Sequence, residues 1–243
     1  RFHFSMLFSV PIAYYLFKPV DVRSTVEALL WVSGLLFFIF LHELGHTFAA
    51  QLVGVEVKSV FVWILGGLTN LAYKPEKPVH NLFIAAAGPL VNMLLAFLCV
   101  AAYILFYIVF LPYSNNVELF LWVQTFVNLF FSLAFLNVIL IVFNLLPVYP
   151  LDGGNILHAL MEMFFGKSNA DLITLVISVP FLLLLIVLGI ATRDYILLVF
   201  CVIIAIAISS LNRGLLRKIN LGVNYLFKRS GYYYLLGDYE RAV

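Results

Sequence analysis

The chain has 243 residues, of which 64% are apolar and only 11% charged, and its formal net charge is +2. Soluble domains carry about 25% charged residues, so this composition excludes an ordinary soluble domain and indicates a protein that crosses a membrane several times. A net charge this small, without a run of Lys and Arg interleaved with aromatic residues, argues against nucleic acid as a partner.

Six apolar runs are candidate transmembrane helices, because a bilayer core takes about 20 apolar residues per helix. They lie at residues 2–17, 26–53, 82–111, 119–146, 172–191 and 195–211. The first run is short for a full span. The last two are separated only by Thr192, Arg193 and Asp194, which predicts a tight hairpin. We therefore expect an all-α polytopic membrane protein with about six transmembrane helices.

Two stretches interrupt this pattern. Residues 55–71 are rich in β-branched and aromatic residues and contain a Gly-Gly pair, so we expect a short membrane-associated β segment after the second helix. The stretch PVYPLDGG, residues 147–154, is not expected to be helical throughout because of its prolines and glycines. Irregular backbone at membrane depth is tolerated only where protein or water surrounds it.

The distribution of positive charge predicts the orientation. If six helices cross, both termini share one side, and that side carries eleven lysines and arginines against three on the other. Cytoplasmic loops carry the excess of Lys and Arg in membrane proteins, so both termini are expected in the cytoplasm.

The second apolar run contains HELGH, residues 42–46. Residues four apart share one helix face, so His42 and His46 present two imidazoles to one point, with Glu43 beside them. This HExxH pattern is typical of a zinc site in which the glutamate is the general base. A hydrogen-bonded cluster between helices is the alternative. Inside an apolar span it is disfavoured, because each polar residue there is costly.

Catalytic zinc usually has three protein ligands. The candidates for the third are Asp152, His158, His80, His3 and Glu162. Asp152 is favoured because it follows a broken segment at the cytoplasmic end of the fourth apolar run. The two histidines lie about 10–17 Å short of the same end of the second run. His3 and His80 are interpreted as interfacial or capping, and Glu162 as part of a solvated helix face. For His158 the alternatives are a role that supports a ligand, an interfacial position or no catalytic part, and the last two are favoured.

Three motifs in this order resemble the site-2 protease family of intramembrane zinc metalloproteases, over roughly residues 1–212. They are HELGH, then AGPLVN at residues 87–92, then NLLPVYPLDGG at residues 144–154, with a Gly-Gly pair between the first two. The resemblance implies one zinc ion held by His42, His46 and Asp152, with Glu43 as the catalytic base. It also implies cleavage of the transmembrane segments of membrane-anchored protein substrates. Asn144 matches an asparagine that helps to hold the substrate or the developing oxyanion.

The chain departs from the family pattern in two places. Basic residues are expected after the aspartate motif, and Asn155 and His158 stand there instead. There is no PDZ-like insertion between the apolar runs, so the chain resembles the compact branch. Residues 213–243 form a basic cytosolic tail, interpreted either as the start of a tetratricopeptide-repeat domain or as an amphipathic tail on the membrane surface.

A helical substrate hides its carbonyl groups and must be extended before attack. We expect the 55–71 segment to pair with the extended substrate by strand addition, with Gly66 and Gly67 allowing a close approach of its backbone. Two other classes remain open. A non-proteolytic membrane metal-binding protein or transporter would tend to show internal repeats. A membrane protease for soluble or lipidated chain ends would favour a downstream glutamate ligand.

Overall fold

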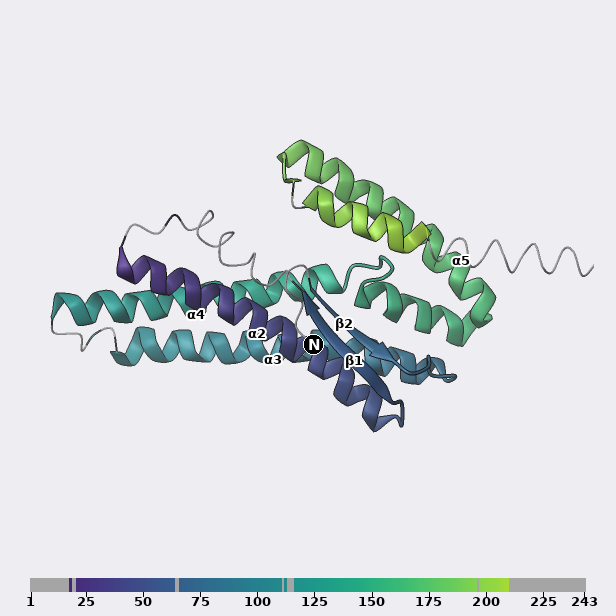
Figure 1. Cartoon of the computed structure of the whole chain (residues 1–243), viewed down its shortest axis with the longest axis horizontal. Helices are drawn as coiled ribbons and strands as arrows, with labels where there is room; N and C mark the ends of the chain where they lie inside the picture. The colour runs from purple at the N-terminus through teal and green to yellow at the C-terminus, as the bar shows by residue number, and fades with distance from the viewer. Residues whose placement is uncertain are drawn as a thin grey trace, which may run out of the picture.

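The computed structural model describes residues 18, 21–63, 66–110, 112, 116–195 and 197–209 (Figure 1). The elements in chain order are α2 (Val22–Leu52), β1 (Val57–Trp63), β2 (Gly66–Leu71), α3 (Pro78–Leu105), its π-helical extension η2 (Phe106–Phe110), α4 (Val117–Asn144) and α5 (Asp152–Thr192). A further apolar helix, Leu197–Ser209, follows α5.

Four helices in the described part of the chain are long and apolar enough to cross a membrane: α2, α3 with η2, α4 and α5. This confirms a mainly helical protein of membrane-spanning character, but not the expected six spans. The first apolar run and residues 213–243 lie outside the described residues. The described part of the sixth run, Leu197–Ser209, covers fewer than the about 20 residues that a span needs.

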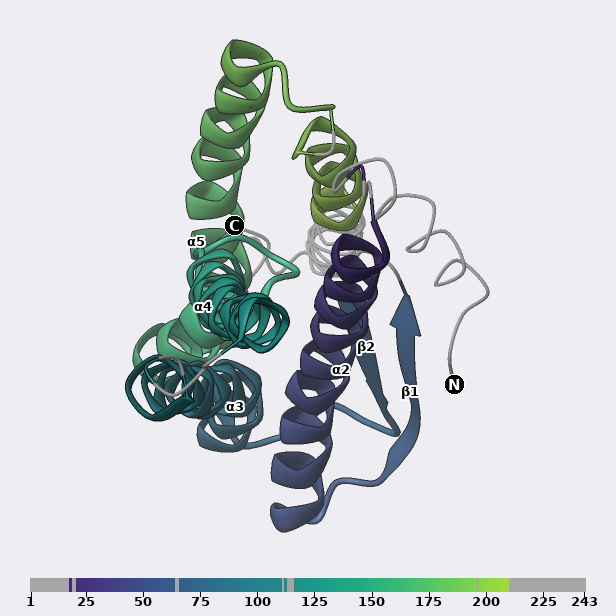
Figure 2. The same ribbon diagram turned by 90° about the vertical axis from the view of Figure 1, so that its left-hand side faces the viewer.

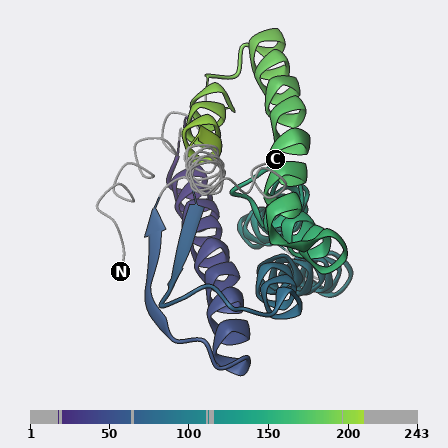
Figure 3. The same cartoon turned by 90° about the vertical axis from the view of Figure 1, so that its right-hand side faces the viewer.

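The β segment expected after the second helix is confirmed, and it consists of two strands rather than one. β1 and β2 form an antiparallel hairpin in which Val60 is opposite Thr69 and Val62 is opposite Gly67. Gly66 opens β2, so the Gly-Gly pair belongs to the second strand. Figures 2 and 3 show α2 between this hairpin on one side and the α3–α4 pair on the other.

The chain between α4 and α5 is irregular over residues 145–151, as expected from its prolines. The stretch at residues 147–154 is not helical throughout, as expected, and its last two residues, Gly153 and Gly154, lie in the first turn of α5. A Cβ at Gly153 would overlap the carbonyl group of Leu145. A glycine is therefore needed at this position, because the backbone of the irregular chain contacts the backbone of the first turn of α5.

α5 contains one sharp bend, at Gly166, whose φ of 75° lies in the left-handed region that favours glycine. It divides the helix into two limbs, residues 152–165 and 167–192, and the second limb turns back from the first (Figure 1). The second limb packs against Leu197–Ser209 around a shared apolar cluster. Its buried members are Val148, Leu182, Leu185, Cys201, Ile204 and Ile208. The hairpin expected around residues 192–194 is therefore confirmed.

α3 is the central helix of the described chain, because it packs against α2, α4 and α5. A second apolar cluster joins Phe38 of α2 and Cys99 of α3 to Leu129, Leu133 and Ala134 of α4. These contacts place the HELGH turn of α2 next to the start of α3 and, across it, the start of α5.

Candidate metal centre and active site

His42 and His46 lie on one face of α2, as their spacing predicts, and both are buried, with 6% and 7% of their surface exposed. Their Nε2 atoms are 3.1 Å apart. No break interrupts α2 near this point, so the regular helix alone brings the two imidazoles together.

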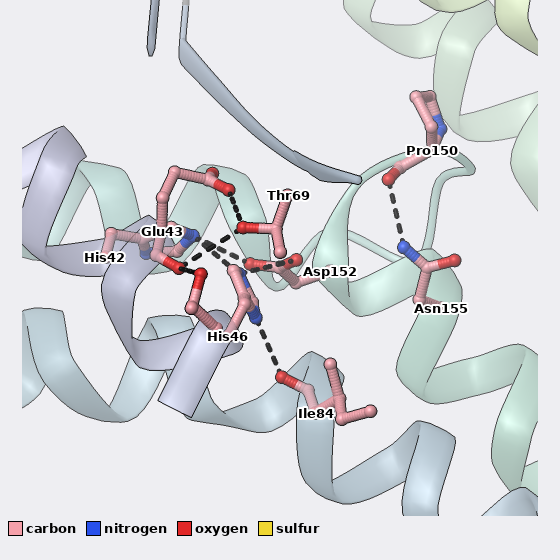
Figure 4. Close-up of polar contacts among 9 residues, drawn as sticks. His42, Glu43, His46, Thr69, Ile84, Pro150, Asp152 and Asn155 are labelled. Atoms are coloured by element: carbon pink, nitrogen blue, oxygen red, sulfur yellow. Dashed lines mark hydrogen bonds and ion pairs between the residues drawn. The ribbon is translucent and has the colours of Figure 1, made fainter. Parts of the chain in front are cut away.

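Asp152, the first residue of α5, completes the group (Figure 4). Its Oδ2 lies 3.1 Å from His42 Nε2, and its Oδ1 lies 3.3 Å from His46 Nε2. One donor atom from each of the three side chains lies within 4.8 Å of the other two. Among the candidates for a third ligand, Asp152 is the one that joins the histidines in the described part of the chain.

The separations between these donors fit a tetrahedral metal ion. Two ligand atoms at 2.0–2.1 Å from a tetrahedral zinc ion lie about 3.3 Å apart. The shortest observed separations are of this size: 3.1 Å between the two Nε2 atoms, 3.1 Å from His42 Nε2 to Asp152 Oδ2 and 3.3 Å from His46 Nε2 to Asp152 Oδ1, the other carboxylate oxygen. Two imidazole nitrogens and a carboxylate are also the donor types that zinc takes in proteins. The residues therefore fit a zinc ion by both distance and chemistry.

A backbone group of α3 fixes the orientation of His46. The Nδ1 atom of His46 lies 2.7 Å from the carbonyl oxygen of Ile84. Because that carbonyl can only accept, Nδ1 carries the hydrogen and Nε2 presents its lone pair to the centre. His42 has no such support among the described residues, where its buried Nδ1 atom lacks a hydrogen-bond partner.

The AGPLVN motif supplies the space that the two imidazoles fill. A Cβ at Gly88 would lie 2.6 Å from His42 Nε2 and would also overlap the ring of His46. A side chain there would displace both rings, so this glycine is required by the close approach of α3 to the centre.

Glu43 lies next to the two histidines and is held from the hairpin. The Thr69 hydroxyl of β2 donates a hydrogen bond of 2.8 Å to Glu43 Oε2 (Figure 4). Gly67, two residues earlier in β2, is so close that a Cβ there would lie 2.5 Å from both Cδ and Oε1 of Glu43. β2 therefore borders the carboxylate directly.

The remaining candidate ligands lie elsewhere. His80 is in the first turn of α3, where its backbone N–H bonds the carbonyl of Lys77. His158, for which an interfacial position or no catalytic part was favoured, is buried, with Nε2 only 2.7 Å from Asp171 Oδ1. Glu162 was placed on a solvated face, and its Oε2 is buried 3.6 Å from His158 Nδ1. His3 lies outside the described residues.

The candidate substrate-binding residues are Asn144, Gly66 and Gly67, and they lie at the end of α4 and at the start of β2. Asn144 is the half-buried last residue of α4, directly before the irregular chain that leads to Asp152. Gly66 opens β2 opposite Trp63, and Gly67 touches Glu43.

Thr69 and the Ile84 carbonyl are contacts that the sequence reasoning missed. A threonine in a β segment has no distinguishing pattern, and a backbone carbonyl leaves no trace in a sequence. Gly88 could have been found, because it stands inside a motif already singled out.

Residues 30–187 of the chain match peptidase family M50. A zinc metalloprotease of Methanocaldococcus jannaschii is 28% identical over 192 residues, which are 77% of this chain and 52% of that protein. Stage IV sporulation protein FB of Bacillus subtilis is 34% identical over 152 residues, or 62% of this chain and 47% of that protein. The chain spans between 36% and 52% of the length of the first five curated relatives it matches.

The fold is also similar to a solved structure, that of a site-2 protease from Methanocaldococcus jannaschii. The TM-score is 0.55 at 24% sequence identity, and the match covers 86% of this chain and 88% of the other. At this identity the likeness establishes the fold.

Proposed function

The chain belongs to peptidase family M50, and from this premise we propose that it is a zinc metalloendopeptidase that cleaves the transmembrane segments of membrane-anchored proteins. One observation carries the proposal. Donor atoms of His42, His46 and Asp152 converge within 4.8 Å of one another between apolar helices, with Glu43 beside them. Family membership favours this activity over a metal carrier or transporter.

His42 and His46, through Nε2, and Asp152, through its carboxylate, would hold one zinc ion per chain. Three protein ligands leave one position open, as catalytic zinc sites require. Bound zinc supplies Lewis acidity, which polarises the carbonyl group of the scissile peptide bond and makes water more acidic.

Glu43 is the general base in this proposal. It takes a proton from the attacking water and delivers it to the nitrogen of the leaving amine. The hydrogen bond from Thr69 holds Glu43 Oε2 in place. Gly67 has no Cβ, and a Cβ at that position would overlap the Glu43 carboxylate. Both contacts come from β2, which supports a role for this strand in catalysis as well as in substrate binding.

β2 is the strand best placed to hold an extended substrate. β1 covers one of its edges, and in the described part of the chain no further strand pairs with the other. A substrate strand added there would be held by main-chain hydrogen bonds, with little demand on its side chains. Gly66 and Gly67 would let its backbone approach closely. Asn144 would bind the substrate or the developing oxyanion from the end of α4.

The protein is an integral membrane protein, and we propose that both termini are cytoplasmic and that the metal centre lies nearer the cytoplasmic face. The bias of lysines and arginines supports this orientation. Residues 213–243 form a separate cytosolic tail in the proposal, and residues 1–212 form the protease core. A cysteine at Glu76 should be protected from an impermeant reagent outside intact cells, and labelling of that cysteine would reverse the orientation.

The activity is tested with purified full chain and a reporter that contains one transmembrane segment. We expect zinc analysis to give about one ion per chain and wild-type protein to cut the reporter. Glu43→Gln should retain zinc and lose about 10²–10⁴-fold in rate, because the proton acceptor is gone. Glu27→Gln, on the same helix away from the centre, is the matched control and should keep full activity. A zinc-loaded wild type that leaves every reporter intact would contradict the proposal.

Substrate handling is tested by changing the reporter alone. Helix-breaking residues near the cleavage point should raise the rate, because they release the backbone for strand pairing. Helix-stabilising residues at the same positions should lower it. Equal rates for the two reporters would show that strand addition is the wrong picture, even if the zinc assignment holds.

A further inference from the structure

The second limb of α5 carries a row of polar side chains on its buried face. Asp171, Thr174 and Ser178 are spaced three and four residues apart and so share one face, and all three are buried. Further along the same face the buried residues are apolar, namely Leu182 and Leu185. Polar groups in so apolar a helix are costly unless they are bonded, so this row, here called the polar face, requires a reason.

The polar face contacts the first limb of α5 through a hydrogen bond between buried side chains. His158 Nε2 lies 2.7 Å from Asp171 Oδ1, and the two residues are 5% and 9% exposed. On the other side of the ring, His158 Nδ1 lies 3.6 Å from Glu162 Oε2. The two nitrogens of an imidazole point in opposite directions, so the two carboxylates do not converge on one point. The trio therefore does not form a second metal site.

The polar face also holds the irregular chain before α5. The backbone N–H of Tyr149 donates a hydrogen bond of 3.0 Å to Ser178 Oγ. Val148, the preceding residue, is fully buried in the apolar cluster of Leu182, Leu185 and the last described helix. Two adjacent residues of the irregular chain thus contact the second limb, Val148 through apolar packing and Tyr149 through a hydrogen bond.

Asp152 lies between these two attachment points. Tyr149 is three residues before it, and His158 is six residues after it, or about 9 Å along the helix. The segment that carries Asp152 is therefore hydrogen-bonded to one face of the second limb both before and after Asp152 in the chain. Neither of these two hydrogen bonds, Tyr149–Ser178 or His158–Asp171, involves the side chain of His42, His46 or Asp152.

We propose that Asp171, through His158, and Ser178, through Tyr149, are positioning residues that set the place of the Asp152 carboxylate opposite the two histidines. The metal affinity of the centre then depends on a helix face whose hydrogen bonds go to His158 and Tyr149 and not to the three ligand side chains. This inference rests on the proposed function in one respect, which is that Asp152 is a metal ligand.

The test measures zinc affinity of the full chain in detergent by competition with a chelator of known affinity. We expect Asp171→Leu to weaken zinc binding up to about tenfold, the lower end of the range found when a partner bonded directly to a metal ligand is lost, because Asp171 acts on Asp152 only through His158 and the helix. Asp171→Asn keeps an acceptor for His158 and should recover most of the affinity. Ser178→Ala should have a smaller effect in the same direction. Ser132→Ala is the matched control, because within the described part of the chain that hydroxyl bonds only the Leu129 carbonyl of its own helix.

A double-mutant cycle separates positioning from general loss of stability. If Asp171 acts through Asp152, Asp171→Leu should not weaken zinc binding further in an Asp152→Asn background. Additive losses in the double variant would overturn the inference, and so would unchanged affinity in both Asp171→Leu and Ser178→Ala. If Asp171→Leu does not fold, Asp171→Asn and Ser178→Ala in the same two backgrounds decide the question. A separate result, unchanged affinity in Asp152→Asn alone, would instead contradict the ligand assignment of the proposed function.

Discussion

The two sides of the candidate metal centre differ in how the chain holds them. His42 and His46 stand on one uninterrupted helix, and their separation follows from helix geometry alone. Asp152 opens a helix after an irregular stretch, and contacts from residues 171 and 178 fasten the chain around it. One side is therefore set by local structure and the other by tertiary contacts, so the two sides should respond differently to substitution.

The largest expected effect comes from removing the ligands themselves. His42→Ala together with His46→Ala should bring zinc to background, because a carboxylate alone does not hold the ion. Asp152→Asn should leave weak binding by the two histidines, reduced by more than the roughly 10–100-fold that losing an outer partner costs. Metal analysis after dialysis measures both. Equal zinc content in wild type and the double histidine variant would remove the basis of the comparison.

The next effect tests the hairpin that borders the histidine side. Gly67→Ala places a methyl group against the carboxylate of Glu43, and displacing a catalytic group by about 1 Å can cost 10²-fold in rate. We expect the reporter to be cut about 100-fold more slowly with zinc content unchanged. Asn70→Ala, at an exposed position of the same strand, serves as the control. A loss of zinc in Gly67→Ala would mean that the hairpin supports the ligands as well as the base.

A smaller effect is expected at the aspartate side. Gly153→Ala adds a methyl group where the Leu145 carbonyl crosses the first turn of α5, which should shift Asp152 and weaken zinc binding about tenfold. The chelator competition described above measures it. If Gly153→Ala binds zinc like the wild type, the position of Asp152 does not depend on the contact between Gly153 and the Leu145 carbonyl.

The smallest effect concerns a single hydrogen bond. Thr69→Val keeps the shape of the side chain and removes the donor to Glu43 Oε2. A typical hydrogen bond contributes about 0.5–1.5 kcal/mol net, so the rate should fall by about 2–10-fold. Zinc content should not change. A Thr69→Val enzyme as fast as the wild type would show that Glu43 needs no support from β2.

The contrast between the two sides also explains what could be predicted from the sequence. HELGH could be interpreted in advance because helix periodicity fixes which residues face one another. Asp152 could be favoured because a carboxylate after a proline-broken segment is unusual in so apolar a chain. The two hydrogen bonds on either side of it could not be predicted, because no local sequence pattern pairs Asp171 with His158 or Ser178 with Tyr149.

The same reasoning explains which details of the fold could not be predicted. The prolines and glycines of residues 147–154 predicted an interruption of the helix, but not the residue at which the next helix begins. Gly153 and Gly154 lie inside the first turn of α5, where they contact the backbone of residues 145–149, and such a tertiary contact leaves no local pattern. The β segment was predicted from its β-branched and aromatic residues, but its division into two strands was not, because the Gly-Gly pair was not recognised as part of the second strand.

The irregular chain over residues 145–151 has one more consequence, which concerns the supply of the second reactant. Hydrolysis consumes one water molecule for every peptide bond, and hydrocarbon holds almost none. Backbone without helical hydrogen bonds is stable at membrane depth only where protein or water satisfies it. We therefore expect the break before Asp152 to mark the route by which water enters, so that one interruption of the helix both sets a ligand in place and hydrates the reaction.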